Sequence, residues 1–163
     1  MTALKPGTRA PEVQLPLLGG GSFSLHDARK GGPVLLAFFK ISCPVCQFTF
    51  PYVDRIHQAY PKAKIIGVSQ DDAKDTAAFA REYGVTFPIA LDDVHRYPVS
   101  NAYGLTNVPS LFLVGEDGSI ELTCVGWSRA DIQQIGAAFG KVENKPAAAI
   151  FRKAESVPDF KAG

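Results

Sequence analysis

Residues 33–46 read PVLLAFFKISCPVC and join a continuous apolar run to two closely spaced cysteines. The run at 34–39 follows a proline and contains no polar side chain, which is typical of a strand buried on both faces. Such strands occur in sheets whose two faces are covered by helices. The stretch therefore predicts an α/β protein in which a buried strand leads directly to the CPVC motif at 43–46.

The composition is that of a single globular domain. The chain has 163 residues, of which 46% are hydrophobic and 20% are charged. This is enough apolar material for a sizeable core, and it excludes a disordered, collagen-like or coiled-coil chain. Lys and Arg number 17 against 16 Asp and Glu. A balance so close to neutral predicts binding neither to nucleic acid nor to an acidic membrane surface.

Cysteine content and the start of the chain bear on the compartment. Three cysteines are too few, and odd in number, for a secreted scaffold stapled by disulfides. Residues 1–14 contain no apolar segment of the kind that a signal peptide needs, and the run at 34–39 is far too short to span a membrane. We expect a cytoplasmic protein without a membrane partner. Export is the alternative for a chain whose signal has been removed.

Strand and helix signals alternate along the rest of the chain. Alternating apolar residues on both sides of the glycines at 19–21 predict an N-terminal hairpin. Helical spacing follows the CPVC motif, and Asp-Gly at 117–118 is the strongest hairpin signal. Further strands are expected at 65–68, 88–91, 111–114 and 120–125, and helices at 72–83, 98–104 and 128–140. This order predicts a central mixed sheet with helices on both faces.

Residues 141–163 differ in character, so we divide the chain into a domain at 1–140 and a C-terminal extension. Pro146 favours a short helix over 147–155, because proline suits the first turn. Ile150, Phe151, Val157 and Phe160 would then pack back onto the domain. A partly disordered tail is the alternative.

The last residue, Gly163, follows no obvious terminating signal. This suggests the hypothesis that the natural chain continues to a further redox residue such as cysteine or selenocysteine. The gene sequence a few codons past Gly163 tests it.

The CPVC motif carries the chemistry. Two cysteines at i and i+3 in the first turn of a helix can close a small disulfide ring. The helix N-terminus stabilises a thiolate on Cys43, whereas Cys46 lies one turn in and is less exposed. This asymmetry suits thiol–disulfide exchange, in which Cys43 attacks a substrate disulfide and Cys46 resolves the mixed disulfide.

Two other uses of the motif are possible. A non-enzymatic zinc module needs two further ligands, but the remaining candidates form no second paired cluster: His26, His57, His95 and Cys124. A copper site with a downstream histidine lacks its third ligand, because no histidine follows His95. Two inert buried cysteines are the remaining alternative, against which Ser42 and Pro44 mark a turn.

Several segments in a fixed order make the sequence recognisable. They are PGTRAP at 6–11, the strand at 33–39, CPVC at 43–46, GVSQD at 67–71 and YGLTNVPS at 103–110. In this order, residues 6–140 resemble the thioredoxin-like redoxin family, in the thiol-disulfide oxidoreductase branch related to the peroxiredoxins. The resemblance implies an enzyme with a thioredoxin-like α/β fold, an N-terminal β-hairpin and a central αβ insertion.

The resemblance also implies a substrate groove. In the family, the proline equivalent to Pro109 is cis and faces the CxxC motif. Val108 would then pair its backbone with a substrate strand, while Ser42, Pro44 and Pro109 shape the groove. A trans proline that opens an edge strand is the alternative.

The implied reaction needs no bound cofactor or metal beyond the redox-active disulfide Cys43–Cys46. Its substrate would be a protein disulfide, and thioredoxin or a similar thiol donor would recycle the enzyme. In a reducing cytoplasm the expected direction is reduction of the partner.

Three positions depart from the family pattern. Ser42 replaces a tryptophan, Ala37 replaces a buried aspartate, and Thr49 replaces a glutamate that accepts a proton in many reductases of the branch. Proton transfer at Cys46 would therefore rely on water. Lys40 allows two interpretations: its ammonium lowers a neighbouring thiol's pKa and makes the disulfide more oxidising, or its charge simply reaches solvent.

A peroxiredoxin-like thiol peroxidase with antioxidant activity is the alternative function. Peroxiredoxins carry a proline and a threonine seven and three residues before the peroxidatic cysteine, where this chain has Leu36 and Lys40. Their peroxide-polarising arginine would fall near Pro109. Reduction of hydroperoxides stays an alternative because any low-pKa thiol reacts slowly with peroxide.

Overall fold

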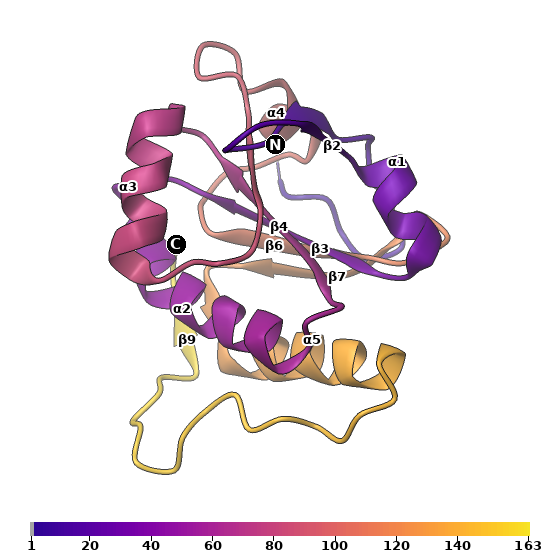
Figure 1. Ribbon diagram of the computed structural model, residues 1–163, viewed down its shortest axis with the longest axis vertical. Helices are drawn as coiled ribbons and strands as arrows, with labels where there is room; N and C mark the ends of the chain where they lie inside the picture. Colours follow the sequence, from indigo (N-terminus) through magenta and orange to yellow (C-terminus); the bar gives the residue numbers. More distant parts are fainter. Residues whose placement is uncertain (1) are drawn as a thin grey trace.

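The computed structural model describes residues 2–163 (Figure 1). Its centre is a five-stranded sheet in the order β5-β4-β3-β6-β7. The strands are β3 (Val34–Phe39), β4 (Lys64–Ser69), β5 (Ile89–Leu91), β6 (Ser110–Val114) and β7 (Ile120–Val125). β4 runs parallel to β3 and β5, whereas β6 runs antiparallel to β3 and β7. The predicted mixed sheet is confirmed.

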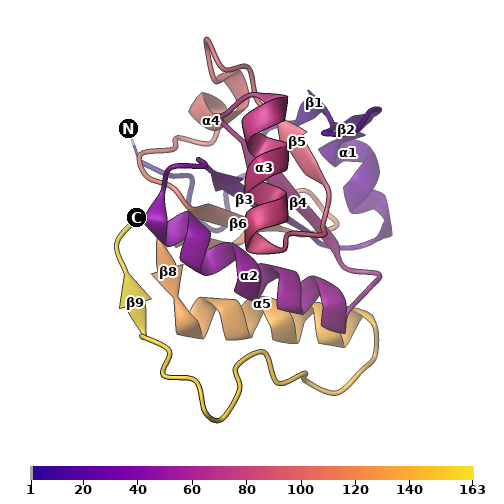
Figure 2. The same cartoon turned by 60° about the vertical axis from the view of Figure 1, so that its left-hand side comes forward.

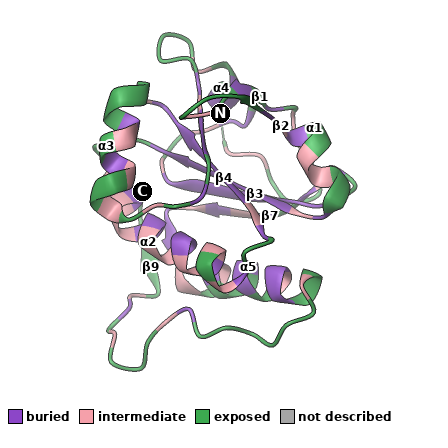
Figure 3. Cartoon of the chain, viewed as in Figure 1, coloured by how far each residue is buried: buried purple, intermediate pink, exposed green. Residues whose placement is uncertain are grey.

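The apolar run at 34–39 occupies the middle of this sheet. All six residues of β3 are buried, and Figure 3 shows the central strands buried beneath the flanking elements. Side chains alternate between the two faces along a strand, so each face of β3 contributes to its own core. Leu35, Ala37 and Phe39 belong to one core, and Val34, Leu36 and Phe38 to the other.

Helices cover both faces. The Leu35 face packs against α2 (Pro44–Ala59), α3 (Ala73–Tyr83) and α5 (Arg129–Val142), and α2 and α5 lie side by side (Figure 2). The opposite face is covered by the hairpin of β1 (Gln14–Pro16) and β2 (Ser22–Ser24), by α1 (Leu25–Ala28) with the 3-10 turn Arg29–Gly31, and by α4 (Pro98–Ala102). The N-terminal hairpin and the αβ insertion between β4 and β6 are thereby confirmed.

Most helix ends lie where local signals predict them. Asp72 caps α3 by accepting a hydrogen bond from the amide of Asp75, and Gly84 ends that helix in the left-handed conformation. α5 differs, because it continues past Gly140 to Val142. A side chain at Gly140 would collide with the hydroxyl of Tyr60. This glycine serves close packing inside the helix, and the predicted end at 140 was wrong.

Of the two alternatives for the extension, the helix over 147–155 was wrong, because no helix forms there. Several backbone groups of this segment form hydrogen bonds with distant side chains, and within 147–155 only the amide of Glu155 donates to a backbone carbonyl, that of Arg152, at 3.0 Å. The amide of Ala148 donates to the Tyr60 hydroxyl at 2.8 Å, and Arg55 donates to the carbonyl of Ile150 at 3.0 Å. These bonds hold the chain in an extended course along α2 and α5 (Figure 2).

The extension ends as a strand. β9 (Phe160–Lys161) pairs antiparallel with β8 (Trp127–Ser128). Ile150 and Val157 are buried as expected, but the side chain of Phe160 is 64% exposed, contrary to the prediction. Among the described residues, none of the helices has the length and apolar character required to cross a membrane.

Candidate active site

The CPVC motif lies where β3 passes into α2. Cys43 is the N-cap of α2, with extended backbone, and its Sγ accepts a hydrogen bond from the amide of Cys46 at 3.2 Å. Pro44 takes the first helical position, where no N–H is required. The Cys43 sulfur thus lies at the N-terminus of a sixteen-residue helix, with a backbone N–H aimed at it.

The two cysteines differ in exposure as the motif predicts. Both are free thiols; Cys43 is half-buried and Cys46 is buried. Burial, together with the hydrogen bond to the Cys43 side chain, raises the pKa of the Cys46 thiol far above its usual value. Cys46 therefore keeps its proton at neutral pH, whereas Cys43 can be reached from outside.

The peptide bond between Val108 and Pro109 is cis, as the resemblance implied. The Cys43 thiol donates a hydrogen bond to the carbonyl of Val108 at 3.3 Å. Pro109 is buried, and its carbonyl accepts a hydrogen bond from the amide of Gly126 at 2.8 Å. The fold thus brings the start of α2 and the start of β6 together.

The remaining predicted residues differ in their exposure. Ser42 and Pro44 are exposed. Thr49 is fully buried one turn beyond Cys46, and its hydroxyl oxygen has no hydrogen-bond partner among the described residues. Lys40 is exposed, with its Nζ 6.0 Å from the centre of the Tyr97 ring.

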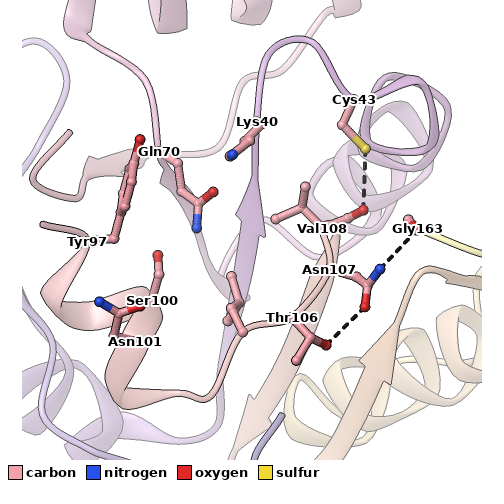
Figure 4. A pocket seen from close by; sticks show the side chains of 11 residues that line it. Lys40, Cys43, Gln70, Tyr97, Ser100, Asn101, Thr106, Asn107, Val108 and Gly163 are labelled. Atoms are coloured by element: carbon pink, nitrogen blue, oxygen red, sulfur yellow. Dashed lines mark hydrogen bonds between the residues drawn. The ribbon is translucent and has the colours of Figure 1, made fainter. Parts of the chain in front are cut away.

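A pocket of about 410 Å³ opens beside Cys43 (Figure 4). Polar and apolar groups contribute about equally to its wall. Its lining consists of Lys40, Cys43, Gln70, Tyr97, Ser100, Asn101, Leu105, Thr106, Asn107, Val108 and Gly163. Of these lining residues, Lys40, Cys43 and Val108 were predicted from the sequence, and the remaining ones, most of them polar, were missed. Gln70 and Asn107 stood within recognised segments, whereas nothing in the sequence marked Tyr97.

The C-terminal segment forms one wall of the pocket and was also missed. The side-chain amide of Asn107 donates to the carbonyl of Gly163 at 3.1 Å. A side chain at Gly163 would collide with the carbonyl of Val108, and one at Gly126 would collide with the carbonyl of Lys161. Two glycines thus permit three backbone segments to meet next to the dithiol.

The cysteine and histidine candidates for a metal site do not gather. Within residues 2–163, no three His, Cys, Asp or Glu side chains come together in a metal-binding arrangement. Cys124 is a core residue, 2% exposed, and burial raises its pKa to about 12.

The chain is similar to known proteins over most of its length. The AhpC/TSA family model matches residues 6–123. The thiol-disulfide oxidoreductase ResA of Geobacillus thermodenitrificans is 33% identical over 137 residues, which cover 82% of this chain and 77% of the relative. The thioredoxin-like protein YneN of Bacillus subtilis is 31% identical over 128 residues, covering 76% and 73%.

Solved structures agree with the fold. The thioredoxin domain of a thiol-disulfide oxidoreductase from Bacteroides vulgatus superposes with a TM-score of 0.71 at 26% identity, covering 87% of this chain and 98% of that one. A thiol:disulfide interchange protein from Bacteroides sp. gives a TM-score of 0.72 at 26% identity, covering 86% and 91%. Because the family match runs through the CPVC motif and the cis-proline segment alike, this chain belongs to the AhpC/TSA family.

Proposed function

We propose that the protein is a thiol-disulfide oxidoreductase that reduces a disulfide of a partner protein with the dithiol of Cys43 and Cys46. The observation that carries this proposal is the position of Cys43, which is half-buried at a helix N-terminus. Its thiol donates a hydrogen bond to the Val108 carbonyl and accepts one from the Cys46 amide. Similarity to proteins named thiol-disulfide oxidoreductases supports it.

The reaction takes place in two exchanges. The Cys43 thiolate attacks one sulfur of the substrate disulfide, forms a mixed disulfide and expels the other sulfur as a thiolate, which takes a proton from solvent. Cys46 then loses its proton and attacks the Cys43 sulfur, which releases the second substrate thiol and leaves the Cys43–Cys46 disulfide. Two electrons pass to the substrate, so no bound cofactor is required.

The proton of Cys46 leaves through water in this proposal. Thr49 cannot act as a base, and no Asp or Glu side chain lines the pocket that holds Cys43. The second exchange is therefore the step that depends on solvent access to a buried thiol.

The substrate strand lies along the backbone of Val108, with Ser42 and Pro44 at the rim and Pro109 beneath it. The exposure of both rim residues and the partial exposure of Val108 support this placement. A thioredoxin-like thiol donor returns two electrons to the Cys43–Cys46 disulfide. Reduction of the partner is the direction in a reducing compartment, for which we propose the cytoplasm.

A comparison of two oxidants tests the function against a thiol peroxidase. The reduced protein is mixed separately with hydrogen peroxide and with a disulfide-bonded peptide, and the reaction is followed by Trp127 fluorescence and thiol loss. Trp127 reports on the site because its ring lies 4.9 Å from that of Phe48 in α2. We expect rapid oxidation by the peptide and a peroxide reaction no faster than that of an ordinary thiol, both lost in Cys43→Ser. The reverse order would identify a peroxidase.

A further inference from the structure

The pocket beside Cys43 carries a single charged side chain. Lys40 is the only Lys, Arg, Asp or Glu among its lining residues. Within residues 2–163, the ammonium of Lys40 makes no ion pair. Lys40 therefore supplies the one charged side chain in the pocket wall next to the attacking sulfur.

The strand fixes where this charge lies. β3 is buried along its whole length, and Lys40 is the first residue to leave the sheet, three positions before Cys43. In Figure 4 the Lys40 side chain points toward the space that Gln70 and Val108 also face. Its flexible stem can move the charge within that space but cannot carry it to the far side of the sheet.

Two further hydrogen-bonding groups of the pocket are uncommitted. The backbone of Gln70 is anchored, because its amide donates to the carbonyl of Phe39 at 3.1 Å. The side-chain amide of Gln70 and the hydroxyl of Tyr97 make no hydrogen bond to the rest of residues 2–163. In contrast, Asn101 donates to the carbonyl of Arg96, and Asn107 donates to that of Gly163.

An ammonium beside free amide and hydroxyl groups is an arrangement that binds a carboxylate. We propose that this pocket is a subsite for a carboxylate of the substrate, and that the preferred substrates are disulfides with an acidic group next to the reacting cysteine. This inference rests on the proposed thiol–disulfide exchange. Its ligand chemistry is shared by an acidic peptide and by a small acidic disulfide such as glutathione disulfide. The pocket volume of about 410 Å³ accommodates a carboxylate-bearing group of the acidic peptide or of glutathione disulfide.

The first experiment compares matched disulfide peptides that differ only in Glu or Gln beside the cysteine. We expect the wild-type kcat/KM to be about five- to tenfold higher for the acidic peptide, the size of one charge-assisted contact that is partly exposed. The preference should disappear in Lys40→Met and fall as salt is added. Lys74→Met, an exposed lysine outside the pocket, is the control and should keep it.

Hydroxyethyl disulfide, which is neutral, separates substrate binding from activation of Cys43. Lys40→Met should change the rate for this neutral disulfide far less than the rate for the acidic peptide. If Lys40→Met slows the neutral and acidic substrates equally, Lys40 acts on the thiol and the subsite is wrong. An equal rate for both peptides in the wild type would also overturn the subsite while leaving the exchange reaction intact.

Binding without turnover keeps the two proposals apart. Titration of Cys43→Ser with the same disulfide peptides should show tighter binding of the acidic one, and equal binding would contradict the subsite even if no disulfide were reduced. Failure of the wild type to reduce any disulfide would contradict the proposed function instead. Glutathione disulfide is the last substrate to be tested. If its reduction also depends on Lys40, the subsite binds carboxylates in general. If only reduction of the acidic peptide depends on Lys40, the subsite binds the carboxylate of a peptide strand.

Discussion

The thiol of Cys43 donates a hydrogen bond to the carbonyl oxygen of Val108, 65 positions further along the chain, at 3.3 Å. One residue is the cap of α2 and the other immediately precedes Pro109, at the start of β6. The attacking sulfur thereby touches the backbone on which we place the substrate strand. Breaking this hydrogen bond frees the sulfur and the carbonyl at the same time, so substrate pairing and sulfur release are linked.

The resolving step should depend strongly on pH. Burial raises the pKa of Cys46, so only a small fraction is thiolate at neutral pH, and that fraction grows about tenfold for each pH unit. We predict that the breakdown of a preformed mixed disulfide on Cys43 accelerates continuously from pH 6 to pH 9 in stopped-flow measurements. A rate that is flat over this range would reveal a protein group that takes the proton.

The hydroxyl of Thr49 should weaken the fold without assisting the reaction. It is fully buried and has no hydrogen-bond partner among the described residues. Replacing it in Thr49→Val removes an unpaired polar group at nearly constant volume. We expect the free energy of unfolding in urea to rise by about 1 kcal/mol, with an unchanged rate of resolution. A slower resolving step in Thr49→Val would place the hydroxyl on the proton's path.

Acid should release the C-terminal segment. Arg55 forms a two-pronged ion pair with Glu155, with distances of 2.7 and 2.8 Å, and this hydrogen bonding lowers the pKa of Glu155 from 4.5 to about 2. A carboxylate whose pKa is depressed by folding stabilises the docked segment above pH 4.5 and loses that contribution progressively as the pH falls toward 2.

Hydrogen exchange of residues 150–163 between pH 5 and pH 2 measures this effect. We predict that protection falls with pH in the wild type, and that Glu155→Gln has lower protection at pH 5 and a flatter profile. Glu116→Gln, in the exposed turn between β6 and β7, is the matched control. The same pH profile in Glu155→Gln and in the wild type would show that the ion pair does not hold the segment.

The end of the chain should restrict access to Cys43. A side chain at Gly163 collides with the carbonyl of Val108, so Gly163→Val should lift the last residues off the pocket wall. We predict faster alkylation of Cys43 by a bulky maleimide, with little change for iodoacetamide, which is small enough to enter beside the docked segment. Ala162→Val, at an exposed position of the same segment, should alkylate as the wild type does. Equal rates for all three proteins would contradict a gating role.

The parts of the fold that local signals specify were predictable. The unbroken apolar run of β3, the acceptor side chains Asp72 and Ser128 at helix starts, and the Asp-Gly turn at 117–118 each act over a few residues. The roles of the two cysteines were also predictable from a local signal, because the start of the helix that holds them can be recognised in the sequence. Their pairing with Val108 came from the family resemblance.

The remainder depends on contacts between distant segments. Gly140 suits either a helix end or close packing, and only the position of Tyr60 decides between them. The extension lacks a helix because its backbone groups bond to side chains such as Arg55 and Trp127, whose Nε1 donates to the carbonyl of Pro158 at 2.7 Å. Tyr97 joins the pocket only when the αβ insertion folds back onto the sheet.

The intact mass of Cys46→Ser after incubation with a disulfide-bonded peptide tests the central claim most directly. Without its resolving thiol, the protein should accumulate a one-to-one mixed disulfide on Cys43 that dithiothreitol releases. Cys43→Ser should form none, because Cys46 and Cys124 are buried. An adduct that maps to Cys124, or continued reduction of the peptide by Cys46→Ser without any adduct, would contradict the assignment of Cys43 as the attacking thiol.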